Sequence, residues 1–372
     1  MQRSIYIRPL GLYGAAPAAP DAEGDASREM WGGLPLAGGR LAFSALEVLE
    51  RSPRGTERRT IGLGDLFERD WGRNTLAAAD LLEAIRAPRP RLAGLSLERP
   101  RLMGIVNVTP DSFSDGGQHD EAEAAVAHGL RLADEGADIL DVGGESTRPG
   151  SDAVSLDDEL RRVIPVIEGL RARTDKLISI DTRKAEVMRR AAAAGADILN
   201  DVSALTHDPE ALEVAAESGL PVMLMHAQGD PKTMNDNPQY SDVVLDVFDY
   251  LEGRIRDCVA AGIPKSRLIA DPGIGFGKHL HHNVAVLNAL SLYHGLGVPL
   301  LLGASRKKLI GQISNVEAPR DRVPGSIAAA LFGVAQGVQI VRVHDVAETR
   351  QALAVWEAAQ TGSEVRASAP IS

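Results

Sequence analysis

The chain has 372 residues, 44% of them hydrophobic, which is enough for one large domain and an additional segment. Its net charge of −11 argues against a broad nucleic-acid-binding surface. The sequence contains no apolar stretch of about 18 residues, so no membrane-spanning helix is predicted. The N-terminus lacks the apolar segment of a secretory signal and Cys258 is the single cysteine, so we expect a cytoplasmic protein without disulfides.

The first 97 residues differ in composition from the rest, being rich in Gly, Pro, Ala and Arg. They contain short strand-like pieces at 4–7 and 40–43 and an amphipathic helix pattern at 75–85. The proline-containing stretch 86–91 predicts a linker. We therefore predict three regions, namely an accessory segment of unknown role at 1–97, the main domain at 98–362 and a flexible tail at 363–372.

From about residue 100 onward, short apolar runs alternate with amphipathic helix patterns. The runs are almost continuously apolar, as expected for parallel strands that are buried on both faces. There are eight of them, at 102–108, 139–143, 177–181, 198–202, 221–226, 268–271, 299–304 and 339–343. Eight strand-then-helix units predict an α/β fold of the (β/α)8 TIM-barrel type. A doubly wound open sheet is the alternative, but no GxGxxG pattern follows the first run.

The helix signals between the runs include starts, stops and one interruption. Ser155 followed by Asp158 predicts a capped helix start, and Pro165 should bend or shorten that helix. Several helix patterns end at a glycine that can adopt a left-handed conformation. These glycines are Gly136, Gly195, Gly219, Gly262 and Gly337.

A polar or ionisable side chain stands at the end of every predicted strand. In a TIM barrel the carboxyl ends of the strands form the active site. A single polar residue there could simply mark where a buried strand reaches the surface, but eight such ends favour a site. The residues are Asn107, Asp141, Asp181, Asn200, Asp201, His226, Asp271, Ser305, Arg306, Lys307, Arg342 and His344.

Two kinds of ligand chemistry follow from these side chains. Carboxylates, an amide and an amine can together bind a flat heterocycle with amide-like edges. Asp181, Asn200, Asp271 and Lys307 are the candidates for this role. Arg148, Arg342 and His344 supply positive charge suited to a phosphate or diphosphate, and the oxygen of Asn107 suits Mg²⁺.

Two glycine-containing loops follow the first two predicted strands. The first strand leads into Thr-Pro-Asp-Ser-Phe-Ser-Asp-Gly-Gly at 109–117, and the second into Gly-Gly-Glu-Ser-Thr-Arg-Pro-Gly at 143–150. Loops of this kind beside an active site often act as lids.

These motifs resemble dihydropteroate synthase over roughly residues 100–360. They occur in the family's order, each at a strand end: Asn-Val-Thr-Pro-Asp-Ser-Phe-Ser-Asp-Gly-Gly at 107–117, Asp-Val-Gly-Gly-Glu-Ser-Thr-Arg-Pro-Gly at 141–150, Ser-Ile-Asp-Thr at 179–182, Asn-Asp-Val at 200–202, Met-His at 225–226, Asp-Pro-Gly-Ile-Gly-Phe at 271–276, Ser-Arg-Lys at 305–307 and Arg-Val-His at 342–344.

The resemblance implies a transferase that joins 6-hydroxymethyl-7,8-dihydropterin diphosphate to para-aminobenzoate, and a homodimer. It implies pterin binding by Asp181, Asn200, Asp271 and Lys307. It implies diphosphate binding by Asn107, Arg342 and His344, with Mg²⁺ at Asn107. It implies that Thr147, Pro149, Phe276 and Arg306 lie at the aminobenzoate site, and that Asp115, Arg148 and Lys307 take part in catalysis.

The resemblance also implies a dissociative mechanism. Diphosphate leaves first, the resulting cation is stabilised by the pterin and by Asp115, and the aromatic amine then attacks. Closed loops would keep water from the cation. No enzyme nucleophile is needed, which agrees with the lack of a Ser/His/Asp pattern.

Two other functions remain open from the sequence. One is a methyltetrahydrofolate-dependent methyltransferase, which shares the Asp/Asn/Asp contacts but needs no Arg-Val-His site. The other is a non-catalytic pterin-binding barrel. Lys308 and Arg183 depart from the family's pattern and leave the aminobenzoate contacts and the third strand end in question. The histidine cluster at 279, 281 and 282 is interpreted as solvent-facing.

Overall fold

The computed structural model describes residues 3–14, 33–68, 71–108, 118–146, 153–229, 234 and 236–361. Asp115, Thr147, Arg148, Pro149 and the predicted tail at 363–372 lie outside these ranges. Among the helices in the described ranges, none is long and apolar enough to cross a membrane.

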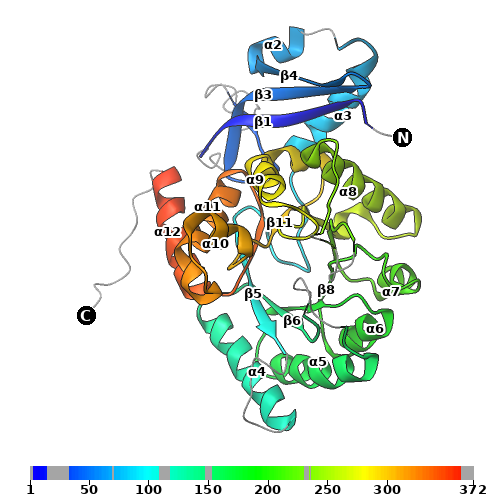
Figure 1. Ribbon diagram of the computed structural model, residues 1–372, viewed down its shortest axis with the longest axis vertical. Helices are drawn as coiled ribbons and strands as arrows, with labels where there is room; N and C mark the ends of the chain where they lie inside the picture. The colour runs from blue at the N-terminus through cyan, green and yellow to red at the C-terminus, as the bar shows by residue number, and fades with distance from the viewer. Residues whose placement is uncertain are drawn as a thin grey trace, which may run out of the picture.

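Eight parallel strands form one sheet that closes on itself, which confirms the TIM barrel (Figure 1). Neighbouring strands follow the order β10-β9-β8-β7-β6-β5-β12-β11, and a parallel bridge from Ala270 to Leu300 joins the two ends. The strands are β5 Arg101–Asn107, β6 Ile139–Gly143, β7 Leu177–Asp181, β8 Ile198–Asp201, β9 Val222–Met225, β10 Leu268–Asp271, β11 Leu301–Leu302 and β12 Ile340–Val343.

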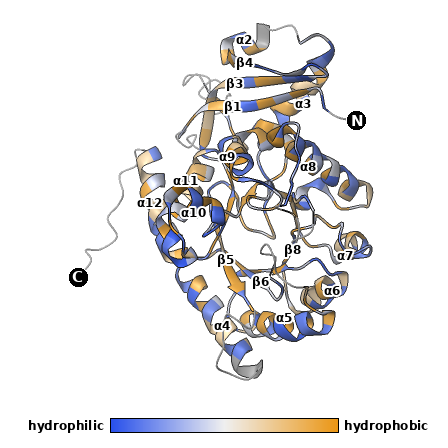
Figure 2. Cartoon of the chain, in the orientation of Figure 1, coloured by the Kyte–Doolittle hydropathy of each residue, from blue (hydrophilic) through white to orange (hydrophobic). Residues whose placement is uncertain are grey.

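Helices surround the strands, and several of them, such as α4 and α5, carry both hydrophobic and hydrophilic residues (Figure 2). They are α4 Gln118–Asp134, α5 Leu156–Arg171, α6 Ala185–Ala194, α7 Ala211–Ser218, α8 Val243–Ala260, α9 Leu280–Asn288, α10 Lys308–Ser314, α11 Val323–Ala335 and α12 Val346–Thr361. A buried 3-10 helix, η4 Leu290–Leu296, joins α9 to β11. The five glycines predicted at helix ends all have φ between +71° and +110°, where a side chain would be strained.

Two local predictions differ from the structure. Helix α5 continues through Pro165 to Arg171 without being shortened, and the burial of Val163, Val166 and Ile167 on either side of the proline supports its continuity. Its start is as predicted, because Ser155 caps the helix by accepting from the Asp158 N–H. The seventh barrel strand, predicted at 299–304, is reduced to Leu301–Leu302.

A layer of apolar side chains fills the amino-terminal end of the barrel. Leu92 and Leu97 pack into this layer, and a tight turn between them is closed by the hydrogen-bonded pair Leu92–Leu95. The strands contribute Met103, Ile139, Ile198, Met223, Ile269, Leu301 and Ile340. The segment before the first barrel strand therefore plugs the barrel at the end opposite the predicted site.

The N-terminal part of the chain, here called the N-terminal module (described residues 3–91), forms a four-stranded antiparallel sheet at one side of the barrel (Figure 1). Its elements are β1 Ile5–Gly14, β2 Leu34–Pro35, β3 Leu41–Ser52, β4 Gly55–Gly62, α2 Leu63–Glu68, η1 Gly72–Asn74 and α3 Thr75–Arg86. The sequence predicted two much shorter strands and missed β4, whose residues are mostly exposed and include the charged Glu57, Arg58 and Arg59. The division of the chain near residue 97 stays a prediction.

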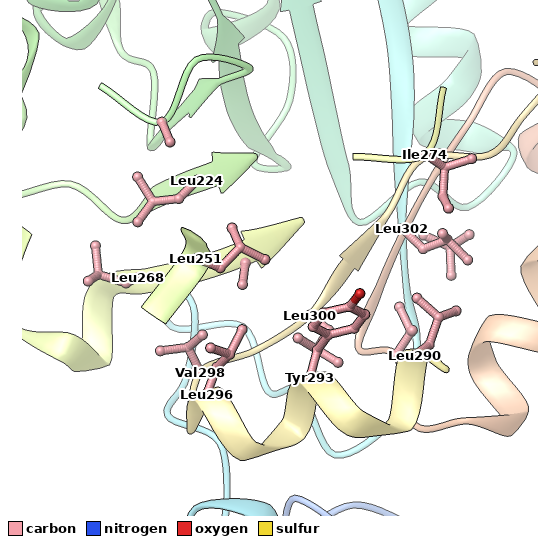
Figure 3. Packing of buried hydrophobic residues seen from close by; sticks show 14 of the residues in the cluster. Leu224, Leu251, Leu268, Ile274, Leu290, Tyr293, Leu296, Val298, Leu300 and Leu302 are labelled. Carbon is pink, nitrogen blue, oxygen red and sulfur yellow. The ribbon is translucent and has the colours of Figure 1, made fainter. Parts of the chain in front are cut away.

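The N-terminal module and the barrel share one continuous hydrophobic core. Tyr6 is fully buried and meets Phe248 of α8 edge-on, with ring centroids 5.5 Å apart. Phe248 in turn stacks on Tyr293 of η4 at 6.4 Å. Figure 3 shows Tyr293 and Leu290 extending from η4 toward Leu300 and Leu302, so η4 lies between the module and the barrel strands.

Polar contacts reinforce this shared core. Arg51 binds both Asp246 and Asp249 of α8, at 2.8 and 2.7 Å, and the hydroxyl of Tyr6 donates to Asp249 at 2.7 Å. Arg89 donates to the carbonyl of His294 in η4. The module is therefore part of the barrel's outer wall rather than a loosely attached segment.

Candidate active site

The alternation of side chains along the strands places polar groups inside the carboxyl end of the barrel. Successive residues of a strand point to opposite faces, so a residue two positions after an interior residue is also interior. Met103 and Ile340 belong to the apolar interior layer. The same rule, applied strand by strand, brings Asn107, Asp141, Asp181, Asn200, Asp271, Arg342 and His344 to the interior above that layer.

Arg342 is the centre of this polar group. Its Nε donates to Asp141 at 2.6 Å and its Nη2 donates to Asp181 at 2.9 Å. Asn200 donates weakly to both oxygens of Asp141 at 3.4 Å. In the structure, then, Arg342 joins three strands through two buried carboxylates, whereas the sequence placed its charge toward a diphosphate.

Burial changes the protonation of these groups. It raises the pKa of Asp181 to about 7; Arg342 opposes this rise and the carboxylate of Asp141 adds to it. Burial also raises the pKa of Asp271, while the charge of Lys307 opposes that shift. The Oδ1 atom of Asp181 is buried without a hydrogen-bond partner, which is costly unless a ligand supplies a donor.

Lys307 reaches the same region from the end of β11. Its ammonium donates to the carbonyl of Ile274 and lies 4.6 Å from the ring centroid of Phe276. A Cβ placed on Gly303 would lie 3.9 Å from both the amine of Lys307 and the side chain of Arg342, so the two cations lie on either side of this glycine at ordinary contact distance. Burial lowers the pKa of Lys307 to about 8, although Asp271 opposes the shift.

The neighbours of Lys307 are held by a separate set of contacts. Arg306 has a left-handed φ of 58°, its N–H donates to Ser326 at 2.8 Å, and its guanidinium binds Asp345. Ser305 and the Nδ1 of His344 lie 3.0 Å apart. The structure thus brings Phe276 and Lys307 together, while the side chain of Arg306 is engaged with Asp345.

Arg183, which departs from the family's pattern, is neutralised. It binds Glu145 at 2.6 Å, and Lys184 binds the other oxygen of Glu145 at 2.6 Å. Burial by itself would raise the pKa of Glu145, but hydrogen bonds and charges from Lys184 and Arg183 bring it below the ordinary value. These ion pairs fix Glu145, which directly precedes Ser146 in the loop after β6, and they add no unpaired charge to the site.

Some strand-end residues have roles that sequence reasoning did not assign. Asp201 accepts from the Ser203 N–H at 2.7 Å and from the Leu205 N–H at 2.9 Å, so it holds a turn. Asp141 was predicted at a strand end but without a role in the site. Its position on the interior face of the strand is the feature that could have indicated such a role. Lys278 was also missed; it is a lysine in a glycine-rich loop, and the structure buries it to 4% exposure.

No group of three or more His, Cys, Asp or Glu side chains within the described ranges is arranged to hold a metal ion. Mg²⁺ commonly binds one or two protein oxygens together with substrate phosphates. The half-buried Asn107, at the end of β5 and on its interior face, fits that kind of site.

Comparison with known proteins gives a consistent result. The model of a family described as "pterin binding enzyme" matches residues 103–344. The chain is 52% identical to dihydropteroate synthase of Escherichia coli strain K12 over 270 residues, which cover 73% of this chain and 95% of that protein. It is 49% identical over 265 residues to dihydropteroate synthase of Haemophilus influenzae, covering 71% of this chain and 95% of that one.

Solved structures agree. The Xanthomonas albilineans dihydropteroate synthase with 4-aminobenzoic acid is 56% identical, with a TM-score of 0.69, covering 73% of this chain and 98% of that one. The same enzyme in complex with 7,8-dihydropteroate is 53% identical, with a TM-score of 0.67, covering 73% and 99%. Because these relatives are covered almost completely, about a quarter of the present chain has no counterpart in them.

Proposed function

The chain belongs to the pterin-binding enzyme family as a dihydropteroate synthase, and we propose that the strand-end site joins dihydropterin diphosphate to para-aminobenzoate. The observation that carries this proposal is the cluster at the carboxyl end of the barrel, in which the buried Asp141, Asp181 and Asn200 lie with the half-buried Arg342 and Lys307. The level of identity to dihydropteroate synthases decides against the methyltransferase alternative.

Asp181, Asn200, Asp271 and Lys307 are proposed to hold the pterin. A pterin presents an amino group and ring N–H groups beside a carbonyl oxygen. The unpartnered Oδ1 of Asp181 is an acceptor for such an N–H, and the amine of Lys307 is a donor for the carbonyl. Filling the acceptor would remove the cost of a buried, unpaired oxygen.

Arg342, His344 and Asn107 are proposed to bind the diphosphate. For Arg342 this requires sharing the guanidinium between its two carboxylate partners and the ligand, which five N–H donors permit. Asn107 would hold Mg²⁺, which when bound offsets the charge of the departing diphosphate. Thr147 and Pro149, outside the described residues, complete with Phe276 and Arg306 the proposed aminobenzoate site.

The reaction needs bond exchange at one carbon. The C–O bond to diphosphate breaks, leaving a cation at the methylene carbon, and the lone pair of the aromatic amine then forms a C–N bond and the nitrogen releases a proton. The residues of this chain orient the two substrates and exclude water. We retain the proposals that Asp115 stabilises the cation and that Arg148 assists, both from loops outside the described residues.

The test is an assay of diphosphate release by the full chain, with both substrates and Mg²⁺. We expect release that depends on para-aminobenzoate and forms dihydropteroate in equal amount. Binding of pterin diphosphate without release would instead support the non-catalytic barrel.

The pH dependence of pterin binding follows from Asp181. Because its pKa is about 7, the carboxyl is increasingly protonated below that pH, and a neutral carboxyl is a weaker acceptor for a ring N–H than a carboxylate is. The KM for pterin diphosphate should therefore rise as pH falls from 8 to 6, by up to about tenfold for each pH unit below the pKa. Asp181→Asn should have a higher KM for pterin diphosphate at every pH, and this KM should not rise as the pH falls. If the KM of the variant still rose at low pH, a group other than Asp181 would cause the rise.

We also propose a cytoplasmic homodimer. Large hydrophobic side chains are exposed on consecutive barrel helices, namely Val284 on α9, Ile313 on α10 and Phe332 on α11. Their exposure supports a contact between two copies that is formed by these late barrel helices.

A further inference from the structure

Lys278 and His226 form a buried pair to which neither the sequence nor the proposed reaction assigned a role. Lys278 is 4% exposed and His226 is 5% exposed, and the Nζ of the lysine lies 2.8 Å from the Nδ1 of the histidine. His226 directly follows β9, and Lys278 closes the loop that begins after Asp271, the last residue of β10. The pair therefore connects the ends of two neighbouring barrel strands.

The other contacts of Lys278 are backbone carbonyls, and the two nearest belong to its own loop. Its amine donates to Gly273 at 2.8 Å and to Phe276 at 3.1 Å, with His226 O further away at 3.5 Å. Three close partners match the three N–H bonds of an ammonium. A neutral amine could also make all three contacts, because it would donate to both carbonyls and accept a hydrogen bond from the Nδ1–H of His226. The arrangement therefore does not depend on the protonation state of Lys278.

The loop that Lys278 holds is also the loop that contacts Lys307. Gly273, whose carbonyl accepts from Lys278, donates its N–H to Asp271 at 2.7 Å. Gly273 has a φ of +68°, and an added Cβ would meet the carbonyl of His226 at 1.9 Å, so loop and strand end are in close contact. Ile274 and Phe276, between the anchored residues, provide the carbonyl and the ring beside the amine of Lys307.

We propose that Lys278 is a positioning residue of the synthase: it fixes the loop after β10 against His226 and thereby places Phe276 and the Ile274 carbonyl around Lys307. This inference rests on the proposed function of Lys307 and Phe276. The proposal also explains the Met-His motif at 225–226, because its histidine is the contact of Lys278 at the end of the neighbouring strand.

The test compares Lys278→Met with Lys176→Met, a lysine just before β7 at the opposite end of the barrel. Misplacing a substrate-contacting group by about 1 Å can cost on the order of 100-fold. We expect Lys278→Met to raise the KM for para-aminobenzoate by about 10–100-fold, with a smaller change in the KM for pterin diphosphate, and Lys176→Met to match the wild type. Kinetics are measured well below Tm, on protein shown to be folded by circular dichroism.

A lowered Tm with both KM values and kcat unchanged would mean that Lys278 is only structural, and the proposal would be wrong. His226→Leu is a milder second variant, should Lys278→Met fail to fold; it should raise the same KM by a smaller factor. The double variant should be no worse than Lys278→Met, because both residues act through one contact, whereas additive losses would contradict the proposal.

A crystal structure of the variant separates this inference from the function it rests on. If Lys278→Met leaves the Phe276 ring over Lys307, the positioning role is overturned whatever the activity. If the wild-type chain releases no diphosphate, the proposed function fails while the displacement of Phe276 remains measurable.

Discussion

Replacement of Lys307 by methionine is expected to lower kcat/KM by about 10²–10³-fold, the loss typical of removing one preorganised hydrogen-bond donor from a catalytic site. Methionine keeps most of the length and apolar contact of the side chain but cannot donate to a ligand or to the Ile274 carbonyl. Since Asp271 and Asp181 both oppose the lowering of the pKa of Lys307, its loss also leaves those carboxylates with less compensating charge. Steady-state kinetics with both substrates measure the effect.

Lys308 provides a matched control in the next position. It is exposed at the start of α10, so Lys308→Met makes the same chemical change outside the site. We expect activity close to that of the wild type. Equal losses in the two variants would show that the positive charge of the segment, rather than the buried amine of Lys307, is what matters.

Replacement of Tyr6 by alanine is expected to lower the free energy of unfolding by about 3–5 kcal/mol, the range for deleting a buried aromatic ring. Tyr6 is fully buried against Phe248, its ring lies 5.4 Å from the guanidinium carbon of Arg51, and its hydroxyl donates to Asp249. Because the N-terminal module and the barrel share one core, the variant should unfold in a single transition at lower urea concentration.

Urea unfolding followed by circular dichroism and by diphosphate release tests this expectation. Leu76→Ala is the control, because Leu76 belongs to the same module but is 80% exposed; it should change stability by less than about 0.5 kcal/mol. If Tyr6→Ala instead produced an early transition with full activity retained beyond it, the module would fold independently of the barrel.

The barrel could be predicted from sequence because its strands are short apolar runs with polar residues at their ends. The exceptions have physical causes. Strand β4 carries Glu57, Arg58 and Arg59 on exposed positions and has no apolar run, so its pairing with β3 is invisible to a hydrophobicity pattern. Pro165 normally interrupts a helix, but tertiary packing of the residues around it retains α5.

The site could be located from sequence, but its internal contacts could not. Strand ends identify which residues meet, whereas the pairing of Arg342 with Asp141 joins residues separated by 201 positions and depends on strand order and side-chain direction. Likewise, Lys278 looks like an ordinary loop lysine until its burial beside His226 is known. A charged residue at a strand end predicts a binding site, but it does not predict which charged residues pair with each other in the protein without a ligand.

The contact between Tyr6 and Asp249 has a consequence for synthesis on the ribosome. The two residues are 243 positions apart, so the first strand of the protein is made long before the helix that covers it. At a translation rate of about 5–20 residues per second, the interval is on the order of 10–50 seconds. During that time only the N-terminal module itself, including α3, can cover Ile5, Tyr6, Ile7 and Phe43. The nascent chain is therefore expected to need chaperone protection until α8 emerges.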